Sequence, residues 1–229
     1  MAAEMKLQGL FLILGDINTA RGVSARYALF LALLSVGGCT SDLVYDAIPP
    51  GATVLAFGDS ITHGTGAGAG EDFPRHLAER SGWVVINAGI PGDMARDARR
   101  RLPTLLTEYR PQAVLVELGG NDFLRQRRES AVKEDLRAIV QTISASGAQP
   151  ILVAIPRLSV LRAKIGALAD SEIYVELSEE EGVPLISDVL SQVLSEEHLR
   201  ADPVHPNSEG YQALANGIIS RLLEFGLMD

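Results

Sequence analysis

Residues 113–122 read Ala-Val-Leu-Val-Glu-Leu-Gly-Gly-Asn-Asp, a short and nearly uninterrupted apolar run that ends in two glycines and two polar residues. A strand with one exposed face alternates apolar and polar residues, whereas a continuous apolar run is typical of a strand that is buried on both faces. Parallel sheets covered by helices bury their strands in this way. This stretch therefore predicts a central strand of an α/β domain.

Similar apolar runs recur along the chain, and longer segments with helical periodicity separate them. The predicted strands cover residues 53–57, 83–88, 113–118, 151–155 and 183–186. The predicted helices cover about 73–81, 94–109, 130–146, 160–180 and 207–224. Repeated alternation of strand and helix indicates a doubly wound α/β domain with a five-stranded parallel sheet.

Composition restricts the class of protein. The chain has 229 residues, of which 47% are hydrophobic and 21% charged, as expected for one globular domain with a sizeable core. Its formal net charge of −9 argues against a nucleic-acid partner, because phosphate binding favours a basic surface. The single cysteine, Cys39, excludes an internal disulfide.

The N-terminal segment has the pattern of an export signal. Arg21 and Arg26 precede the apolar run 27–36, which is shorter than the roughly 20 residues needed to span a bilayer. The run ends at Val-Gly-Gly-Cys39, which resembles the bacterial lipobox. We therefore expect a signal peptide over 1–38, a tether over 39–51 and the main domain over 52–229, in an exported, periplasmic protein anchored through lipidated Cys39. The alternative is a buried free cysteine at the end of a core segment.

Residue types suited to chemistry follow the predicted strands. In parallel α/β sheets, ligands bind outside the carboxyl ends of the strands, so the segments after those ends converge on one edge. Residues 58–62, 89–93 and 119–122 follow the first three strands, and 202–206 precedes the last helix. Any one residue in these segments has an ordinary structural explanation, such as a helix cap or a turn. Their convergence is what predicts a site.

Three of these residues form a set suited to nucleophilic catalysis. A serine hydroxyl is a weak nucleophile until a base accepts its proton, and histidine titrates near working pH. Asp202, three residues before His205, can accept a hydrogen bond from one imidazole nitrogen and leave the other for Ser60. The sequence thus predicts Ser60 as nucleophile, His205 as base and Asp202 as orienting acid. We expect activity to fall on acidification, as His205 gains a proton.

A tetrahedral intermediate also needs hydrogen-bond donors for its oxyanion. The candidates are the backbone N–H of Ser60, the backbone N–H of a glycine in 89–93 and the side-chain amide of Asn121. Asp59 and Asp93 lie beside these donors. We expect their carboxylates to support the two loops by accepting backbone hydrogen bonds.

Four segments resemble the conserved blocks of the SGNH (GDSL) hydrolase family. They are Gly-Asp-Ser-Ile at 58–61, with Ile in place of the usual Leu, and the segments 87–93, 119–122 and 202–206. Residues 114–122 are especially similar to the branch comprising bacterial thioesterase I, lysophospholipase L1 and arylesterase. The resemblance implies a flavodoxin-like three-layer α/β/α sandwich and hydrolysis of esters or thioesters without metal or cofactor. It also implies that Gly92, and not Gly89, supplies the oxyanion-hole amide.

The functional interpretation is a serine-dependent carboxylic ester hydrolase acting through an acyl-enzyme on a small-molecule ester or thioester, with membrane contact only through the N-terminal anchor. One alternative is an O-acetylesterase acting on cell-wall or other polysaccharides. Another is a non-enzymatic flavodoxin-like binding module, although binding alone needs no nucleophile, base and oxyanion donors.

Other motifs give weaker signals. The glycine-rich segment 63–70 lacks the spacing of a phosphate-binding loop, and the remaining histidines lack the spacing of metal ligands. Seven arginines are expected to lie on solvated helix faces and loops: Arg96, Arg99, Arg100, Arg101, Arg125, Arg127 and Arg128.

Overall fold

The structure is a computed structural model that describes residues 45–157 and 168–229. Its described part contains a five-stranded sheet in the order β2-β1-β3-β4-β5, in which every neighbouring pair is parallel. The strands are β1 (Thr53–Gly58), β2 (Val84–Gly89), β3 (Ala113–Glu117), β4 (Gln149–Val153) and β5 (Leu185–Ile186). The predicted five-stranded parallel sheet is confirmed.

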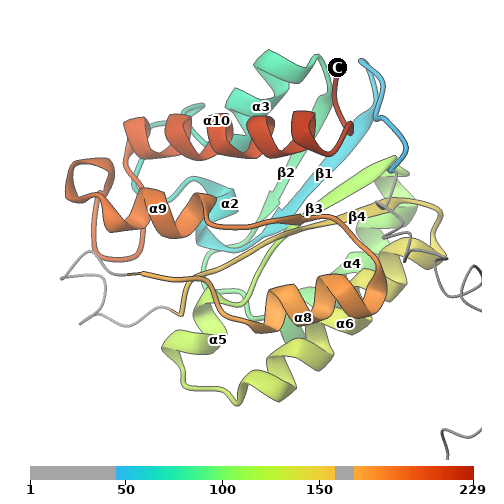
Figure 1. The fold of residues 1–229 in the computed structure, drawn as a ribbon. Coiled ribbons are helices and arrows are strands. Elements are labelled where there is room, and N and C mark those ends of the chain that lie inside the picture. The colour runs from blue at the N-terminus through green and yellow to red at the C-terminus, as the bar shows by residue number, and fades with distance from the viewer. Residues whose placement is uncertain (1–44, 158–167) are drawn as a thin grey trace, which may run out of the picture. The chain divides into compact units, whose positions relative to one another are not determined.

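Helices cover both faces of this sheet (Figure 1). One face carries α3 (Phe73–Ser81), α9 (Val189–Ser195) and α10 (Ser208–Glu224), and the other carries α4 (Ala95–Tyr109), α6 (Glu129–Ala145) and α8 (Ile173–Glu181). Two short helices, α2 (Ser60–His63) and α5 (Gly120–Leu124), follow β1 and β3, and a 3-10 helix, η1 (Glu197–Leu199), follows α9. The predicted three-layer α/β/α arrangement is therefore present.

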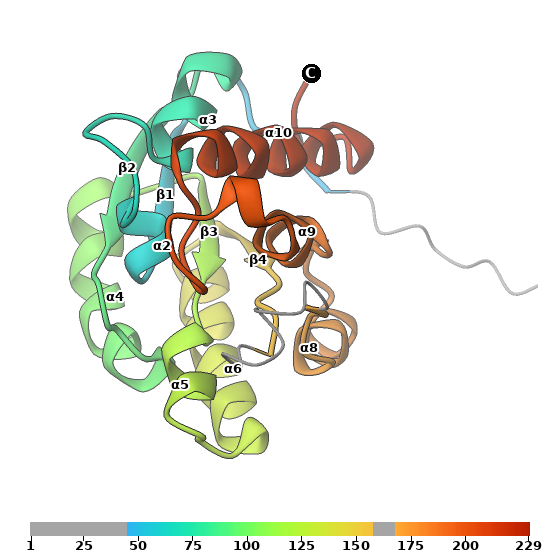
Figure 2. The same cartoon turned by 90° about the vertical axis from the view of Figure 1, so that its left-hand side faces the viewer.

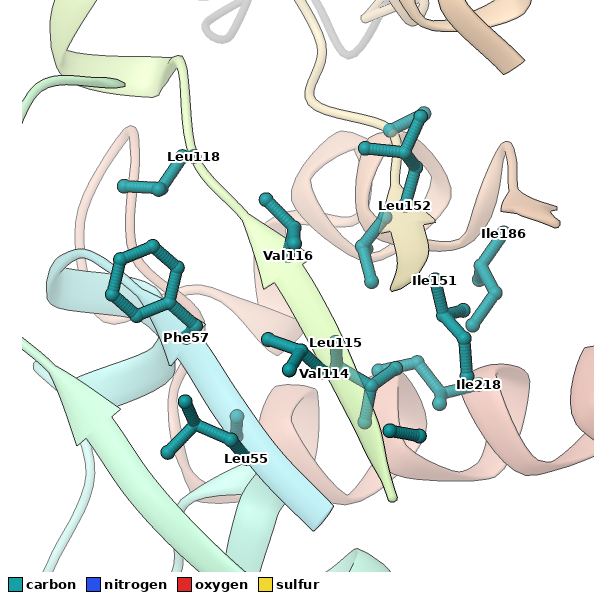
Figure 3. Packing of buried hydrophobic residues seen from close by; sticks show 14 of the residues in the cluster. Leu55, Phe57, Val114, Leu115, Val116, Leu118, Ile151, Leu152, Ile186 and Ile218 are labelled. Atoms are coloured by element: carbon teal, nitrogen blue, oxygen red, sulfur yellow. The ribbon is translucent and has the colours of Figure 1, made fainter. Parts of the chain in front are cut away.

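The hydrophobic core lies between the sheet and its helices. Every residue of β3 is buried, and so are Val54 to Phe57 of β1. Figure 3 shows apolar side chains of β1, β3, β4 and β5 packed with Ile218 of α10. Full burial of one such side chain contributes roughly 1.5–3 kcal/mol, so this packing fixes the strand register that positions the loops. By contrast β2, at the sheet's edge, remains half-exposed.

The sheet register brings the ends of three strands together. Gly58 of β1 is level with Gly89 of β2 and with Glu117 of β3. The chain leaving each of these residues therefore emerges at one edge of the sheet. Figure 2 looks onto this edge, where α2, α5 and the segment that enters α10 meet.

The helix predicted over 160–180 is wrong over residues 168–172. Residues 168–172 are not helical, because Asp170 pairs with Pro156 in an antiparallel bridge, and α8 begins only at Ile173. Residues 158–167 of the predicted helix lie outside the described residues.

The predicted signal peptide and Cys39 also lie outside the described residues. The predicted tether, 39–51, is described from Tyr45 onward, and there Ile48 is buried and its N–H donates to the Leu227 carbonyl at 2.9 Å. Among the helices that the structure describes, none is both long and apolar enough to cross a bilayer.

Candidate active site

Ser60 is held at the end of β1 by the cap of a short helix. Asp59 precedes it and caps α2, with its Oδ1 accepting the N–H of Ile61 at 3.0 Å. Gly58 is needed immediately before this turn, because a Cβ there would overlap the Thr62 hydroxyl and the Glu117 carbonyl. The turn therefore brings Ser60 out of the buried strand to a partly exposed position at the sheet edge.

His205 reaches Ser60 from the other end of the chain. Its Nε2 lies 2.9 Å from Ser60 Oγ, and its Nδ1 lies 2.7 Å from Asp202 Oδ2. Although partial burial alone would raise it, hydrogen bonds from His205 and from the Val204 N–H hold the pKa of Asp202 below its ordinary value. The structure thus brings together the serine, histidine and aspartate that the sequence predicted as one set.

The loop that carries His205 is fixed on several sides. Asp202 Oδ1 accepts the backbone N–H groups of Val204 and His205, both at 2.9 Å. The loop closes through an antiparallel bridge between Arg200 and Pro206. Asn207 then caps α10 by accepting the Gly210 N–H at 2.9 Å. These contacts fix the turn that carries the His205 imidazole.

Asn121, on α5, lies beside the nucleophile turn. Its Nδ2 donates to Asp59 Oδ2 at 2.8 Å. This bond uses one of the two amide hydrogens and leaves the other for a ligand.

The two candidate glycines after β2 differ in what their N–H groups do. The Gly89 N–H donates to Asn87 Oδ1 at 3.0 Å, and a Cβ at Gly89 would overlap the backbone of His63. Gly92 has a φ of 82° and open space where a Cβ would stand. Within the described part of the chain, no hydrogen bond uses the N–H of Gly92 or of Ser60. Both N–H groups are thus available to an oxyanion.

Arg101 of α4 is not in solvent, contrary to the sequence prediction. Its side chain is only 20% exposed and lies over the Phe57 ring, with the guanidinium carbon 4.3 Å from the ring centroid. It donates to the Ala88 carbonyl at 2.9 Å, to the Gly58 carbonyl at 3.0 Å and to Asp93 Oδ2 at 2.8 Å. The physical reason is that carbonyl oxygens at the ends of β1 and β2 lie within reach of the guanidinium, whose several N–H donors need acceptors. Asp93 thus receives a side-chain donor, where backbone donors were expected.

Asp122, the last residue of the segment 119–122, has a structural role that the sequence pattern does not predict. It is fully buried, and its Oδ2 accepts the Ala95 N–H at the start of α4 at 3.0 Å. Arg127 pairs with Asp122 and also with Asp135, at 2.9 Å, so it too is less solvated than predicted. The lack of a capping side chain at Met94 was the available signal that α4 needed an outside acceptor.

Arg125 contacts the segment that carries the candidate oxyanion amide. Its Nη1 donates to the Gly92 carbonyl at 3.2 Å, while the rest of its side chain is exposed. Together with the Asp122–Ala95 bond, this contact ties α5 to residues 92–95. The loops after β2 and β3 therefore form one unit beside Ser60.

Two buried carboxyl groups lie behind Ser60. Burial raises the pKa of Asp59 to about 6, against the opposing effect of its bonds from Ile61 and Asn121. Burial, followed by the charge of Asp59, raises the pKa of Glu117 well above its ordinary value. The sequence predicts Glu117 only as a strand residue, because its contact with Thr62 joins distant segments of the chain. In residues 45–157 and 168–229, no group of three or more His, Cys, Asp or Glu side chains is placed to hold a metal ion.

Comparisons with known proteins identify the family of the chain. A family model described as the GDSL-like lipase/acylhydrolase family matches residues 56–213. The Thioesterase 1/protease 1/lysophospholipase L1 of Escherichia coli K12 is 34% identical over 197 residues, which cover 85% of this chain and 89% of the relative. Esterase TesA of Pseudomonas aeruginosa is 30% identical, covering 76% and 89%. A crystal structure of TesA superposes with a TM-score of 0.67 at 27% identity, covering 76% of this chain and 99% of that one. The family resemblance seen in the four sequence segments is confirmed.

Proposed function

The chain belongs to the GDSL-like lipase/acylhydrolase family and is a GDSL-type hydrolase, and from this premise we propose that it cleaves carboxylic esters through an acyl-enzyme on Ser60. One observation carries the proposal. The two nitrogens of His205 lie within hydrogen-bond distance of Ser60 Oγ and of Asp202 Oδ2, at 2.9 and 2.7 Å. A neutral imidazole can thus accept the serine proton at Nε2 while Asp202 holds the proton on Nδ1.

The first half of the reaction acylates the enzyme. Ser60 Oγ attacks the ester carbonyl as its proton moves to His205 Nε2, and the new C–O bond gives a tetrahedral oxyanion. Asp202 stabilises the imidazolium that forms. When the intermediate collapses, the bond to the leaving alcohol or thiol breaks, and His205 gives that group its proton. Water then repeats the sequence on the acyl-enzyme, releasing the acid and restoring Ser60.

Three donors are proposed to bind the oxyanion. They are the N–H of Ser60, the N–H of Gly92 and the amide hydrogen of Asn121 that Asp59 does not take. The choice of Gly92 over Gly89 is supported by hydrogen bonding, because the Gly89 N–H already donates to Asn87. The Gly92 amide has no such acceptor among the described residues. Asp59 supports these loops by accepting hydrogen bonds from Ile61 and Asn121. Asp93 supports them by accepting a hydrogen bond from Arg101.

The substrate class follows from the reaction and from the relatives. Both oxyesters and thioesters present the carbonyl that this set attacks, and the relatives carry the names thioesterase, lysophospholipase and esterase. The exposed apolar residues Ile90 and Leu124 lie on the two segments that flank the site. They favour a substrate with an apolar acyl chain. Hydrolysis of p-nitrophenyl esters of increasing acyl length measures that preference.

We also propose that residues 1–38 are a signal peptide and that Cys39 anchors the exported domain, 52–229, through the tether over 39–51. The basic flank, the short apolar run and the lipobox-like Val36–Cys39 support this. Intact mass of the processed protein tests it. A mass beginning at Cys39 with added acyl groups is expected, and Cys39→Ser should abolish both the acylation and membrane retention.

The decisive experiment is labelling with a fluorophosphonate together with turnover of an aryl ester. Wild-type protein should be labelled on Ser60, as identified by peptide mass spectrometry. Ser60→Ala should lose both labelling and hydrolysis. Ser130→Ala, at an exposed serine of α6, is the matched control and should keep both. Turnover by Ser60→Ala at the wild-type rate would overturn the proposal.

A further inference from the structure

Glu117, the last residue of β3, lies beneath the helix that begins with Ser60. It is 1% exposed, and its Oε2 accepts two hydrogen bonds from Thr62, from the backbone N–H at 3.1 Å and from the hydroxyl at 2.7 Å. Thr62 is fully buried and lies two residues after Ser60 in α2. A single carboxyl group of the sheet therefore holds the nucleophile's helix by both a main-chain and a side-chain donor.

The same helix is tied to the sheet on its other side. Asn87 of β2 donates from its Nδ2 to the Thr62 carbonyl at 2.8 Å. Between the two anchors, Gly58 leaves so little space that a Cβ would overlap Thr62 Oγ1. Thr62 is thus fixed between β2 and β3, and the position of Ser60 is set by these contacts.

Burial of Glu117 and the charge of Asp59 disfavour a negative charge, and they outweigh the Thr62 donors and the Asp59 backbone N–H, which favour it. Glu117 Oε1 has no hydrogen-bond partner among the described residues, and no described arginine or lysine pairs with it. Asp59 contributes a second carboxyl group nearby. The phenols facing it from α8 and α10, Tyr174 and Tyr211, donate to the carbonyls of Leu118 and Thr65 instead. Arg101, at the same sheet edge, is bonded to Gly58, Ala88 and Asp93.

We propose that Glu117 is a positioning residue for Ser60 and that it holds α2 as an uncharged carboxylic acid. In that form the carbonyl oxygen accepts both Thr62 donors and the proton stays on the other oxygen. One buried hydroxyl without an acceptor costs less than a buried carboxylate without a cation. A neutral Glu117 also keeps an additional negative charge away from the site where the oxyanion develops. The inference rests on the proposed function of Ser60.

Three variants separate this role from mere packing. Glu117→Gln reproduces the neutral acid, with a carbonyl for Thr62 and a donor in place of the O–H group, so kcat should stay within about threefold of wild type. Glu117→Ala removes the acceptor, and misplacement of Ser60 should lower kcat by about 10- to 100-fold with KM unchanged. Glu117→Asp, too short to reach Thr62, should resemble Ala. A Gln variant as impaired as Ala would overturn the neutral state.

Infrared spectroscopy reads the protonation state without any turnover. Near neutral pH, wild-type protein should show a carboxylic-acid C=O stretching band that Glu117→Gln lacks, and the absence of that difference would overturn the inference. Should Glu117→Ala not fold, Thr62→Val, which keeps the shape and loses the hydroxyl, should lower kcat while Thr62→Ser does not. Equal rates in both would contradict the anchoring role. Failure of the proposed function is distinguishable, because it appears as unlabelled Ser60 in wild-type protein.

Discussion

The side chain of Asn121 donates to Asp59 at 2.8 Å, which links the proposed oxyanion donor to the residue directly before the proposed nucleophile. The other oxygen of Asp59 accepts the Ile61 N–H. One buried carboxyl group therefore orients both α2 and α5, the two short helices that begin at the sheet edge. Ser60 and Asn121 consequently depend on Asp59 for their relative position.

Replacing Asn121 tests the oxyanion arrangement. Asn121→Ala removes one donor to the developing negative charge, so kcat should fall by about 10²–10³ with little change in KM. Steady-state hydrolysis of a p-nitrophenyl ester measures both constants. Gln141→Ala, at an exposed amide on α6, should leave both unchanged. A kcat for Asn121→Ala close to that of wild type would remove Asn121 from the proposed hole.

Replacing Asp202 tests the orienting acid. Its lowered pKa indicates a carboxylate that is ionised at working pH and accepts from His205. Asp202→Asn keeps the size of the side chain but lets the amide donate, which favours the wrong tautomer of His205. We expect kcat to fall by as much as about 10⁴. Asp97→Asn, a surface change on α4, is the control. Comparable rates for the two variants would contradict the role of Asp202.

The buried contacts of Arg101 predict that its replacement destabilises the protein more than replacement of the neighbouring Arg100. Arg101→Lys keeps the charge but loses the fork that reaches Gly58, Ala88 and Asp93 together, so the free energy of unfolding should fall by about 1–3 kcal/mol. Arg100 is 79% exposed and contacts only Asp97 among the described pairs. Arg100→Lys should therefore change stability by less than about 0.5 kcal/mol. Urea unfolding compares the two variants. Equal losses in the free energy of unfolding would contradict the stabilising role of the Arg101 contacts.

The sequence sufficed for the features that depend on local pattern. Continuous apolar runs identified the parallel strands, the segments after them contained Ser60 and Asn121, and the segment before the last helix contained Asp202 and His205. Their convergence follows from a general property of parallel sheets, in which all carboxyl ends share one edge. No knowledge of individual contacts was needed for that step.

The contacts that brace the site were beyond sequence reasoning. Helical periodicity assigned Arg101 to solvent because it sees only the neighbours along α4, whereas the acceptors at the ends of β1 and β2 come from distant parts of the chain. Glu117 looked like a strand residue for the same reason. The helix prediction failed over 168–172 because Asp170 pairs with Pro156 in a bridge, and such a pairing leaves no periodic signal in the sequence.

The raised pKa of Asp59 predicts how the free energy of unfolding changes with pH. Burial raises its pKa from 3.8 to about 6, so folding favours the neutral form. The stability that this group contributes is fully present below its unfolded pKa and is lost as the pH rises through about 6. Asp59→Asn does not titrate. The free energy of unfolding of Asp59→Asn, measured relative to that of wild type, should therefore increase between about pH 4 and pH 7.

Urea unfolding of both proteins across that range measures the trend. The Asn side chain places a donor opposite the amide of Asn121, which adds a destabilising offset that does not vary with pH. The slope of the stability difference, and not its sign at one pH, is thus the informative quantity. A difference that stays constant across the range would show that Asp59 does not carry the raised pKa on which this prediction depends.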